Sequence, residues 1–222
     1  MTKPNIIVVS APSGTGKTTL NRRLASEYEQ VEISISHTTR KPRAGEVDGT
    51  HYHFIPREDF DKIIIKEGFL EWAEVHGNYY GTSLAEIERI QKKGHVALLE
   101  IDVQGWLLTR PKIEKALSIF ILPPTLEALW QRLSSRGSED LSVRWLRLQN
   151  AYREIEISDH YDYFVVNDTL EEAYKELSSI IVDGKRGEID AQEGAQLCHK
   201  LKEEYKKADW IQELRAEVQK ES

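Results

Sequence analysis

The sequence predicts an α/β fold built on a doubly wound parallel sheet, and three observations support this class. Short apolar runs alternate along the chain with segments whose apolar residues recur every three or four positions, as strands alternate with helices in such folds. The runs Val96–Leu99 and Ile119–Leu122 are apolar throughout, which is typical of parallel strands covered on both faces. A glycine-containing loop, Ala11–Gly16, connects the first apolar run to the first helical pattern.

The expected elements follow one another in that alternation. Short apolar and β-branched runs predict strands at Asn5–Ser10, Val31–Ser36, His95–Asp102, Ser118–Leu122 and Tyr163–Asn167. Apolar residues at helical spacing predict helices at Leu20–Tyr28, Leu84–Lys92, Leu126–Ser134, Val143–Ile157 and Leu170–Ile181. A chain of 222 residues is long enough to bury the core that these elements imply.

Two stretches interrupt the alternation. Residues 37–82 are dense in polar, aromatic and charged side chains, with only short strand-like pieces at Thr50–Ile55 and Phe69–His76, so an inserted mixed subdomain is expected there. Residues 134–147 hold a polar break flanked by arginines, which is typical of a mobile lid between helices. The predicted division is a core of residues 1–36, 83–124 and 160–184, the insertion 37–82, a helical lid region 125–159 and a charged helical extension 185–222.

The extension carries an apolar stripe within a helix expected at about residues 191–220. The stripe consists of Leu197, Leu201, Tyr205, Ala208, Ile211, Leu214 and Val218. Such a stripe can pack back on the core, mediate self-association into a homo-oligomer, or fray in solution. Packing or association is favoured over disorder, and the sequence does not decide between those two.

Composition excludes several classes of function. A net charge of −7 argues against a general nucleic-acid-binding protein, which normally has a basic face, so no nucleic-acid partner is expected. The single cysteine, Cys198, excludes an internal disulfide and any cysteine-based metal site, and a reducing cytoplasm fits this usage best. No apolar run reaches the 18 or more residues of a membrane span, and the first residues show no signal-peptide pattern, so no membrane partner is expected.

The segment Ser10–Thr18 has the composition and context of a phosphate-binding loop. Gly14 and Gly16 can adopt backbone angles that direct successive N–H groups towards phosphate oxygens, while the following helix adds its positive end. Lys17 would reach the β- and γ-phosphates, and the hydroxyl of Thr18 would hold Mg²⁺. The pattern departs from G-x-x-x-x-G-K-[ST] at Ala11, and the alternative is a glycine-rich turn with an ordinary surface lysine. The predicted contacts are Ala11, Pro12, Ser13, Gly14, Thr15, Gly16, Lys17, Thr18 and Thr19.

The insertion contains a second candidate anion site. Arg40 and Arg43 lie close together beside a proline and a glycine, so their guanidinium groups can converge on one anion. Tyr52 and Tyr80 can donate hydroxyl hydrogen bonds to the same group. The alternative is that this basic stretch is a solvated loop.

In their order along the chain, these motifs resemble those of the guanylate kinases. The similarity extends through Ser36–Arg40, Gly45–Val47, Gly77–Gly81, Ile101–Gly105, Phe120–Pro124, Arg136–Gly137 and Val166–Asp168. It covers about residues 5–183 and leaves the tail outside. The resemblance implies a P-loop kinase with a GMP-binding subdomain and a lid, which transfers phosphate from MgATP to GMP or dGMP.

For the acceptor nucleotide, the resemblance implies a guanine site and a phosphate site. Guanine presents two donors on one edge, N1–H and the N2 amine, so a carboxylate acceptor suits it, and Glu71 matches that position. Further base contacts match Ser36, Thr82, Glu100 and Asp102, with Glu100 standing where the family has Asp. Arg40, Arg43, Tyr52 and Tyr80 match the phosphate contacts, and Glu46 matches a residue that braces the arginines. As an independent expectation, Glu100 and Asp102 are two apart in a strand and so face the same side.

For the donor nucleotide, the resemblance implies that arginines close over ATP or the transferred group. Arg132, Arg136 and Arg147 match these arginines, whereas Arg144 is adjacent and could equally form surface ion pairs. The implied catalytic set is therefore Lys17, Arg40, Arg132, Arg136 and Arg147. Asn167 and Asp168 match a position near adenine, although a turn at the end of a strand explains them equally well.

Three other functions remain as alternatives. A non-catalytic guanylate-kinase-like interaction module shares the fold, a P-loop GTPase shares the loop, and a monophosphate kinase for another base shares the chemistry. Lys17, Thr18 and the arginines argue against the module, and the absence of an Asn-Lys-x-Asp motif argues against the GTPase. His37, His51 and His53 lack a further ligand pattern, so no zinc site is predicted.

Overall fold

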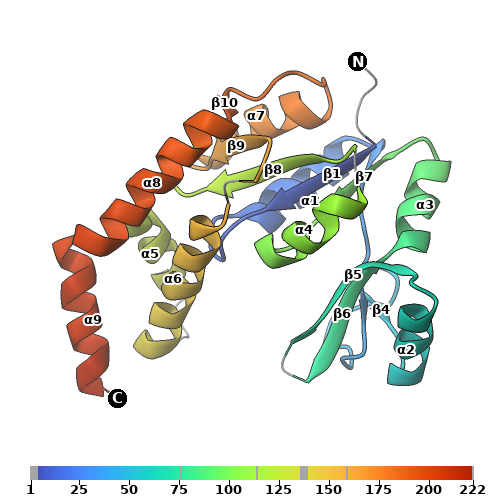
Figure 1. Cartoon of the computed structure of the whole chain (residues 1–222), viewed down its shortest axis with the longest axis horizontal. Helices are drawn as coiled ribbons and strands as arrows, with labels where there is room; N and C mark the ends of the chain where they lie inside the picture. The colour runs from blue at the N-terminus through green and yellow to red at the C-terminus, as the bar shows by residue number, and fades with distance from the viewer. Residues whose placement is uncertain (1–4, 76, 114, 136–139, 159, 222) are drawn as a thin grey trace. The chain divides into compact units, whose positions relative to one another are not determined.

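The apolar runs of the sequence form one six-stranded sheet with the strand order β10-β9-β8-β1-β7-β2 (Figure 1). Its strands are β1 (Ile6–Ser10), β2 (Val31–Ile33), β7 (Val96–Leu99), β8 (Leu117–Leu122), β9 (Tyr163–Val166) and β10 (Ile189–Asp190). The computed structural model describes residues 5–75, 77–113, 115–135, 140–158 and 160–221. The chain divides into two units, residues 1–8 with 25–117 and residues 9–24 with 118–222, so that β1 contributes to both.

In the first unit, β1, β7 and β2 pair in parallel. Ile6 lies opposite Ala97 in the β1–β7 pair, and Val31 lies opposite Val96 in the β2–β7 pair. Leu98 and Leu99 are fully buried, as expected for strands covered on both faces. The predicted α/β class with a parallel sheet is confirmed.

The strand expected at residues 95–102 ends earlier, at Leu99, because the following residues begin a helix. The carboxylate of Asp102 accepts a hydrogen bond from the amide of Gly105 at 2.6 Å and so caps α4 (Val103–Thr109), which leads into the short 3₁₀ helix η1 (Arg110–Lys112). Glu100 and Asp102 therefore lie in a loop. The expectation that both residues belong to the strand was wrong, so strand alternation does not set the directions of their side chains.

The inserted region of the first unit forms a second sheet, with strand order β4-β3-β6-β5. Its strands are β3 (His37–Thr38), β4 (His53–Phe54), β5 (Phe69–Val75) and β6 (Asn78–Ser83). The helix α2 (Arg57–Ile65) packs against this sheet through Phe60, whose ring stacks on Phe69 with 4.3 Å between centroids. Neither α2 nor β6 was predicted from the sequence. The next helix, α3 (Leu84–Lys92), has the predicted bounds and follows the cap Ser83.

In the second unit, β8 and β9 are parallel, and β10 adds an antiparallel edge strand that the sequence analysis did not predict. The helices are α1 (Lys17–Glu27), α5 (Leu126–Ser134), α6 (Leu141–Glu156) and α7 (Leu170–Ile181). Thr125 and Thr169 cap α5 and α7, which explains why both helices begin where predicted. No helix among the described residues is long and apolar enough to cross a membrane.

The extension forms two helices, α8 (Ala191–Lys207) and α9 (Asp209–Glu221), where one continuous helix was expected. The break falls at Ala208, whose ψ of 129° is extended. The stripe residues Leu201, Tyr205, Ile211 and Leu214 are buried, and the two helices contact α6 in the same unit. The stripe is thus used for packing within the chain.

The docking of α8 depends on Gly194, which lies against the ring of Phe164 on β9. A Cβ at this position would overlap ring atoms of Phe164. We expect Gly194→Ala to lower the free energy of unfolding by about 1–3 kcal/mol, because the helix must move away from the sheet. Chemical denaturation measures the change, and Gln196→Ala, an exposed position on the same helix, is the control. Equal stability of the two variants would contradict this packing.

Candidate active site

The loop between β1 and α1 has the backbone geometry that phosphate binding requires. Gly14 and Gly16 have φ angles of +91° and +98°, a region that residues with a side chain rarely adopt. The amide of Thr15 donates to the carbonyl of Pro12 at 3.1 Å and closes the turn. Lys17 is the first residue of α1, so the loop ends at the positive end of a helix.

Several amides of this loop are available to a ligand. Within the described part of the chain, the N–H groups of Gly14, Gly16, Lys17 and Thr18 donate to no protein acceptor. Successive unused donors at a helix N-terminus form an anion site, because the amides and the helix dipole both favour negative charge. The loop therefore provides a cradle for phosphate oxygens.

Asn167, the residue after β9, supports this loop. Its side-chain amide donates to the carbonyl of Thr15 at 2.6 Å, and the residue is only 4% exposed. A Cβ on Gly16 would lie 2.6 Å from the Nδ2 atom of Asn167, so glycine is needed for this close approach. The side chain acts here on the loop backbone, and a contact of Asn167 with adenine stays a prediction.

Two arginines of α5 and α6 reach the same region of the second unit. Arg147 donates to the hydroxyl of Ser13 in the loop at 2.9 Å, and Arg132 donates to the carbonyl of Asp168 at 2.9 Å. The other terminal nitrogen of Arg132 is buried and has no hydrogen-bond partner among the described residues. Arg144 lies over the ring of Trp130 instead, at 5.4 Å, and the predicted Arg136 falls outside the described residues.

The loop also rests on α5, a contact that the sequence analysis missed. A Cβ on Gly14 would lie 2.7 Å from Cδ2 of Leu133 and 3.2 Å from Cδ1 of Leu129. Both leucines are fully buried. Apolar residues of a predicted helix give no sign of the loop that they will contact, so no sequence signal could have identified this pair.

The residues at the start of α1 suit a divalent cation that arrives with a phosphate ligand. The side chain of Thr18 is exposed on the first turn of the helix, next to the unused amides. Among the described residues, no group of three or more His, Cys, Asp or Glu side chains is placed to hold a metal. Mg²⁺ commonly binds through one or two protein oxygens together with substrate phosphates and water, and a single hydroxyl fits that mode.

In the first unit, Glu46 organises the predicted arginine loop. Its carboxylate accepts from the guanidinium of Arg40 at 2.8 Å and from the amide of Arg43 at 2.7 Å. These two hydrogen bonds lower the pKa of Glu46 to about 2, so its charge persists at all physiological pH values. The side chain of Arg43 is exposed, and the hydrogen bond from Arg43 to Glu46 comes from its backbone amide.

Aromatic rings complete this cluster around Arg40. Its guanidinium carbon lies 5.6 Å from the ring centre of Tyr52 and 5.7 Å from that of Phe54. The rings of Tyr52 and Tyr80 meet edge to face at 5.9 Å. Burial and the neighbouring Tyr80 raise the pKa of Tyr52, so its hydroxyl stays protonated and can donate. Both tyrosines were predicted from the sequence as members of this cluster, whereas Phe54 was not.

A second group in the first unit gathers around Glu71 on β5. The amide of Thr82 donates to the carboxylate of Glu71 at 3.0 Å, and the hydroxyls of Ser36 and Thr82 lie 3.4 Å apart. Burial raises the pKa of Glu71, partly offset by the hydrogen bonds from Thr82 and reinforced by the charge of Asp102. The structure thus brings together Ser36, Glu71 and Thr82, with Asp102 within electrostatic range.

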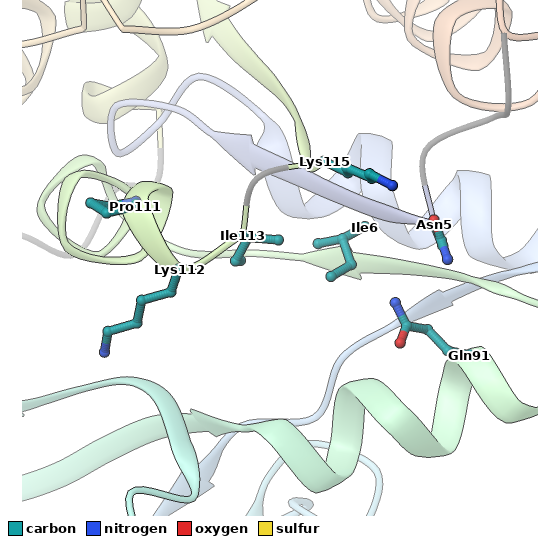
Figure 2. Close-up of a pocket in the computed structure, with 7 residues that line it drawn as sticks. All are labelled: Asn5, Ile6, Gln91, Pro111, Lys112, Ile113 and Lys115. Carbon is teal, nitrogen blue, oxygen red and sulfur yellow. The ribbon is translucent and has the colours of Figure 1, made fainter.

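Two hollows of the first unit contain none of the predicted site residues. Figure 2 shows one of about 430 Å³, lined by Asn5, Ile6, Gln91, Pro111, Lys112, Ile113 and Lys115. The other, of about 460 Å³, is lined by Ile64, Glu67, Phe69, Leu70, Trp72, Leu84 and Lys112. Lys112 borders both, and its ammonium group donates to the carbonyl of Leu70 at 2.9 Å, next to Glu71 in the chain.

A loop of this geometry between a parallel strand and a helix, supported by arginines, defines a P-loop nucleotide-binding protein. Residues 3–184 match the family profile described as guanylate kinase, and the chain belongs to that family. Residues 185–222 lie beyond the match.

Individual relatives agree with this assignment. The guanylate kinase of Neisseria gonorrhoeae is 48% identical over 179 residues, which cover 81% of this chain and 87% of that protein. The guanylate kinase of Clostridium perfringens is 46% identical over 180 residues, covering 81% and 83%. A crystal structure of guanylate kinase from Anaplasma phagocytophilum has a TM-score of 0.63 and 33% identity, covering 85% of this chain and 89% of that one.

The loop geometry generates a prediction for Gly16. In Gly16→Ala, the positive φ angle and the clash with Asn167 would displace the loop, so we expect ATP affinity to fall at least about tenfold. Equilibrium binding of ATP measures the effect. Gly94→Ala is the matched control, because Gly94 also has a positive φ, of 76°, but nothing lies within 4 Å of its Cβ position. Equal ATP binding by both variants would show that the loop does not depend on Gly16.

Proposed function

We propose that this chain is an ATP:GMP phosphotransferase, which transfers the γ-phosphoryl group of ATP to GMP or dGMP and so serves purine nucleotide metabolism. The observation that carries the proposal is that this guanylate kinase family member has two anion-binding groups. One is the loop Ala11–Thr19 in the second unit, and the other is the Arg40 cluster in the first unit, which also contains the half-buried carboxylate of Glu71 that suits guanine.

For ATP, we assign the phosphates to the loop. The unused amides of Gly14, Gly16, Lys17 and Thr18 would donate hydrogen bonds to oxygens of the β- and γ-phosphates, and the ammonium group of Lys17 would add positive charge. Mg²⁺ bound with ATP would be held by the hydroxyl of Thr18 and would neutralise charge on the phosphate oxygens.

For GMP, we assign the phosphate to Arg40, Arg43, Tyr52 and Tyr80. Glu46 fixes the guanidinium of Arg40 through a short ion pair, which leaves the remaining donors of that group oriented before the ligand binds. Arg43 has an exposed side chain on the same loop and would complete the clamp when the phosphate arrives.

For guanine, the carboxylate of Glu71 would accept N1–H and the N2 amine, with Ser36, Thr82, Glu100 and Asp102 as further contacts. Adenine would present an acceptor nitrogen to the same carboxylate and would leave a buried charge unpaired. A site of this kind can discriminate by about 10⁴-fold. The pKa of Glu71 is raised because burial removes this carboxylate from water and so disfavours its charged form.

The chemical step requires positioning and charge neutralisation. An oxygen of the GMP phosphate forms the new bond to the γ-phosphorus while the bond from that phosphorus to the bridging oxygen of ADP breaks, which gives GDP and ADP. The second pKa of a phosphate monoester is about 6, so the acceptor is already largely ionised at neutral pH and no protein base is needed. Lys17, Arg40, Arg132, Arg136 and Arg147 are the proposed catalytic residues, because they neutralise the charge of the two reacting phosphates.

The rest of the chain fits this activity. We propose that residues 1–36, 83–124 and 160–184 act as the nucleotide-binding core, residues 37–82 as the GMP-binding subdomain and residues 125–159 as the lid. A single cysteine fits a cytoplasmic enzyme. The stripe residues Leu201, Tyr205, Ile211 and Leu214 are buried within their own unit, so self-association is not needed to cover them.

A coupled ADP-release assay with GMP, dGMP, AMP, UMP and CMP tests the proposed function. ADP release with GMP and dGMP, and little with the other three nucleotides, is the expected result. No ADP release with any acceptor would indicate a binding module. Release with AMP or a pyrimidine nucleotide in preference to GMP would assign a kinase for another base.

We expect Glu71→Gln to lower kcat/KM for GMP by about 100-fold and to leave the KM for ATP within about twofold, since a glutamine cannot accept both guanine donors. Burial disfavours the ionised form of Glu71, so a neutral glutamine removes that cost at neutral pH and stability should not fall.

The pH profile sharpens this test. Because the pKa of Glu71 is raised, kcat/KM for GMP should fall as the pH drops through that pKa, and this part of the acid limb should vanish in Glu71→Gln. The titration of the GMP phosphate remains in both proteins. Glu74→Gln, an exposed acid on the same strand, is the control. Unchanged GMP kinetics in Glu71→Gln would remove this assignment.

We expect Arg147→Ala to lower kcat by about 10²–10³-fold, because its guanidinium lies at Ser13 of the loop and would neutralise the transferred group. Steady-state kinetics at saturating ATP and GMP measure the loss. Arg153→Ala, an exposed arginine on the same helix, should leave kcat unchanged. A kcat near that of the native protein would eliminate Arg147 from the catalytic set.

A further inference from the structure

The extension, residues 185–222, lies outside the family match but is not a loose tail. In Figure 1, α8 runs beside α5 and α6, and α9 continues along α6; contacts between these helices confirm the arrangement. These are the helices that carry Arg132, Arg144 and Arg147. The extension therefore touches the elements that present the proposed ATP-side arginines.

Glu204 of α8 completes the N-terminus of α5. Its two carboxylate oxygens accept from the amides of Leu126 and Glu127, each at 3.0 Å. The next amide, that of Ala128, donates to the side chain of Thr125 at 3.0 Å. The first amides of a helix have no partner within the helix, so α5 obtains two of its caps from the extension.

Tyr205, the neighbouring residue, packs against α6. Its ring stacks on Tyr152 with 3.9 Å between centroids and an interplanar angle of 16°, and it lies parallel to Trp145 at 6.3 Å. From α9, the guanidinium of Arg215 lies 6.0 Å from the Trp145 ring. Tyr205 is only 8% exposed, so this aromatic stack is part of the packed interior.

The same two helices also contact the phosphate loop. Leu129 and Leu133 of α5 lie against Gly14, and Arg147 of α6 donates to Ser13. Two contact paths thus lead from the extension to the loop. One runs from Glu204 through α5 to Gly14, and the other from Tyr205 through α6 to Ser13.

We propose that Glu204 and Tyr205 are positioning residues for the ATP half of the site, through which the extension holds α5 and α6 against the phosphate loop. This inference rests on the proposed function, because it assigns ATP to that loop. Loss of either contact would let its helix shift and would reduce the share of molecules with a preformed loop. The apparent affinity for ATP would fall in proportion to the fraction of molecules that have a preformed loop. The proposed GMP residues all lie in the other unit, so GMP binding should not change.

Four point variants of the full chain test this role. Glu204→Ala and Tyr205→Ala should each raise the dissociation constant of MgATP by about fivefold, the effect of losing one helix cap or aromatic stack. The constant for GMP should stay within about twofold. Tyr205→Phe keeps the stack and should bind MgATP like the native protein. Glu203→Ala is the matched control, because the ion pairs that Glu203 forms among the described residues are with Lys206 and Lys207 of its own helix.

Hydrogen exchange adds a readout that a general loss of stability would not produce. In Glu204→Ala, the amides of Leu126 and Glu127 should lose protection together with the loop residues 11–19, while residues 36–54 of the arginine cluster keep theirs. By reciprocity, MgATP should increase the protection of Leu126 and Glu127 in the native protein.

Calorimetric binding of MgATP without GMP keeps this test separate from the proposed activity. If the native protein transfers no phosphate but binds MgATP, and the variants weaken that binding, the function fails and the positioning role stands. If Glu204→Ala and Tyr205→Ala bind MgATP as Glu203→Ala does, the positioning role is wrong, whatever their melting temperatures. A parallel loss of MgATP and GMP binding would also overturn it, since that result indicates general unfolding.

Discussion

Phosphate charge is the constraint on which the rest of this structure depends. A chain with a net charge of −7 must attract two nucleotides that are themselves anionic, so the binding energy has to come from a few local donors. The loop supplies backbone amides and a helix terminus, which carry no net charge. These donors can bind phosphate without removing a charged side chain from water. The Arg40 cluster supplies a guanidinium whose orientation is set by Glu46.

Both groups of donors are held by residues that need not touch a ligand. Asn167 fixes the carbonyl of Thr15, the leucines of α5 lie under Gly14, and Glu46 holds both Arg40 and the backbone of Arg43. Such support matters because a donor that must reorganise on binding contributes less than one already in place. Glu204 and Tyr205 extend the same logic beyond the family match, from the extension to the helices that support the loop.

Much of the fold could be predicted because the signals were local. Helices α3, α5 and α7 have the predicted bounds, since Ser83, Thr125 and Thr169 cap regular apolar patterns. The loop and the arginine cluster were also predictable, because short spacings and a family resemblance define them.

Features that depend on distant partners could not be predicted. The strand β6 was not predicted, because its polar residues form a strand by pairing with β5 and with β3, which is distant in the sequence. Asp102 looked like the end of a strand but caps α4, and a cap depends on backbone angles that spacing does not reveal. The hydrogen bonds of Glu204 with α5 join residues that are separated by 77 and 78 positions in the sequence. Neither segment contains a local pattern that predicts this contact.

The most direct measurement follows the γ-phosphate itself. ATP carrying a radiolabel in that group would be incubated with the full chain, magnesium and GMP, and the products would be separated. Direct transfer between two bound nucleotides predicts that the label appears in GDP at the rate of ADP formation, with little in free phosphate. Label that accumulates in inorganic phosphate, or that stays in ATP, would contradict the account.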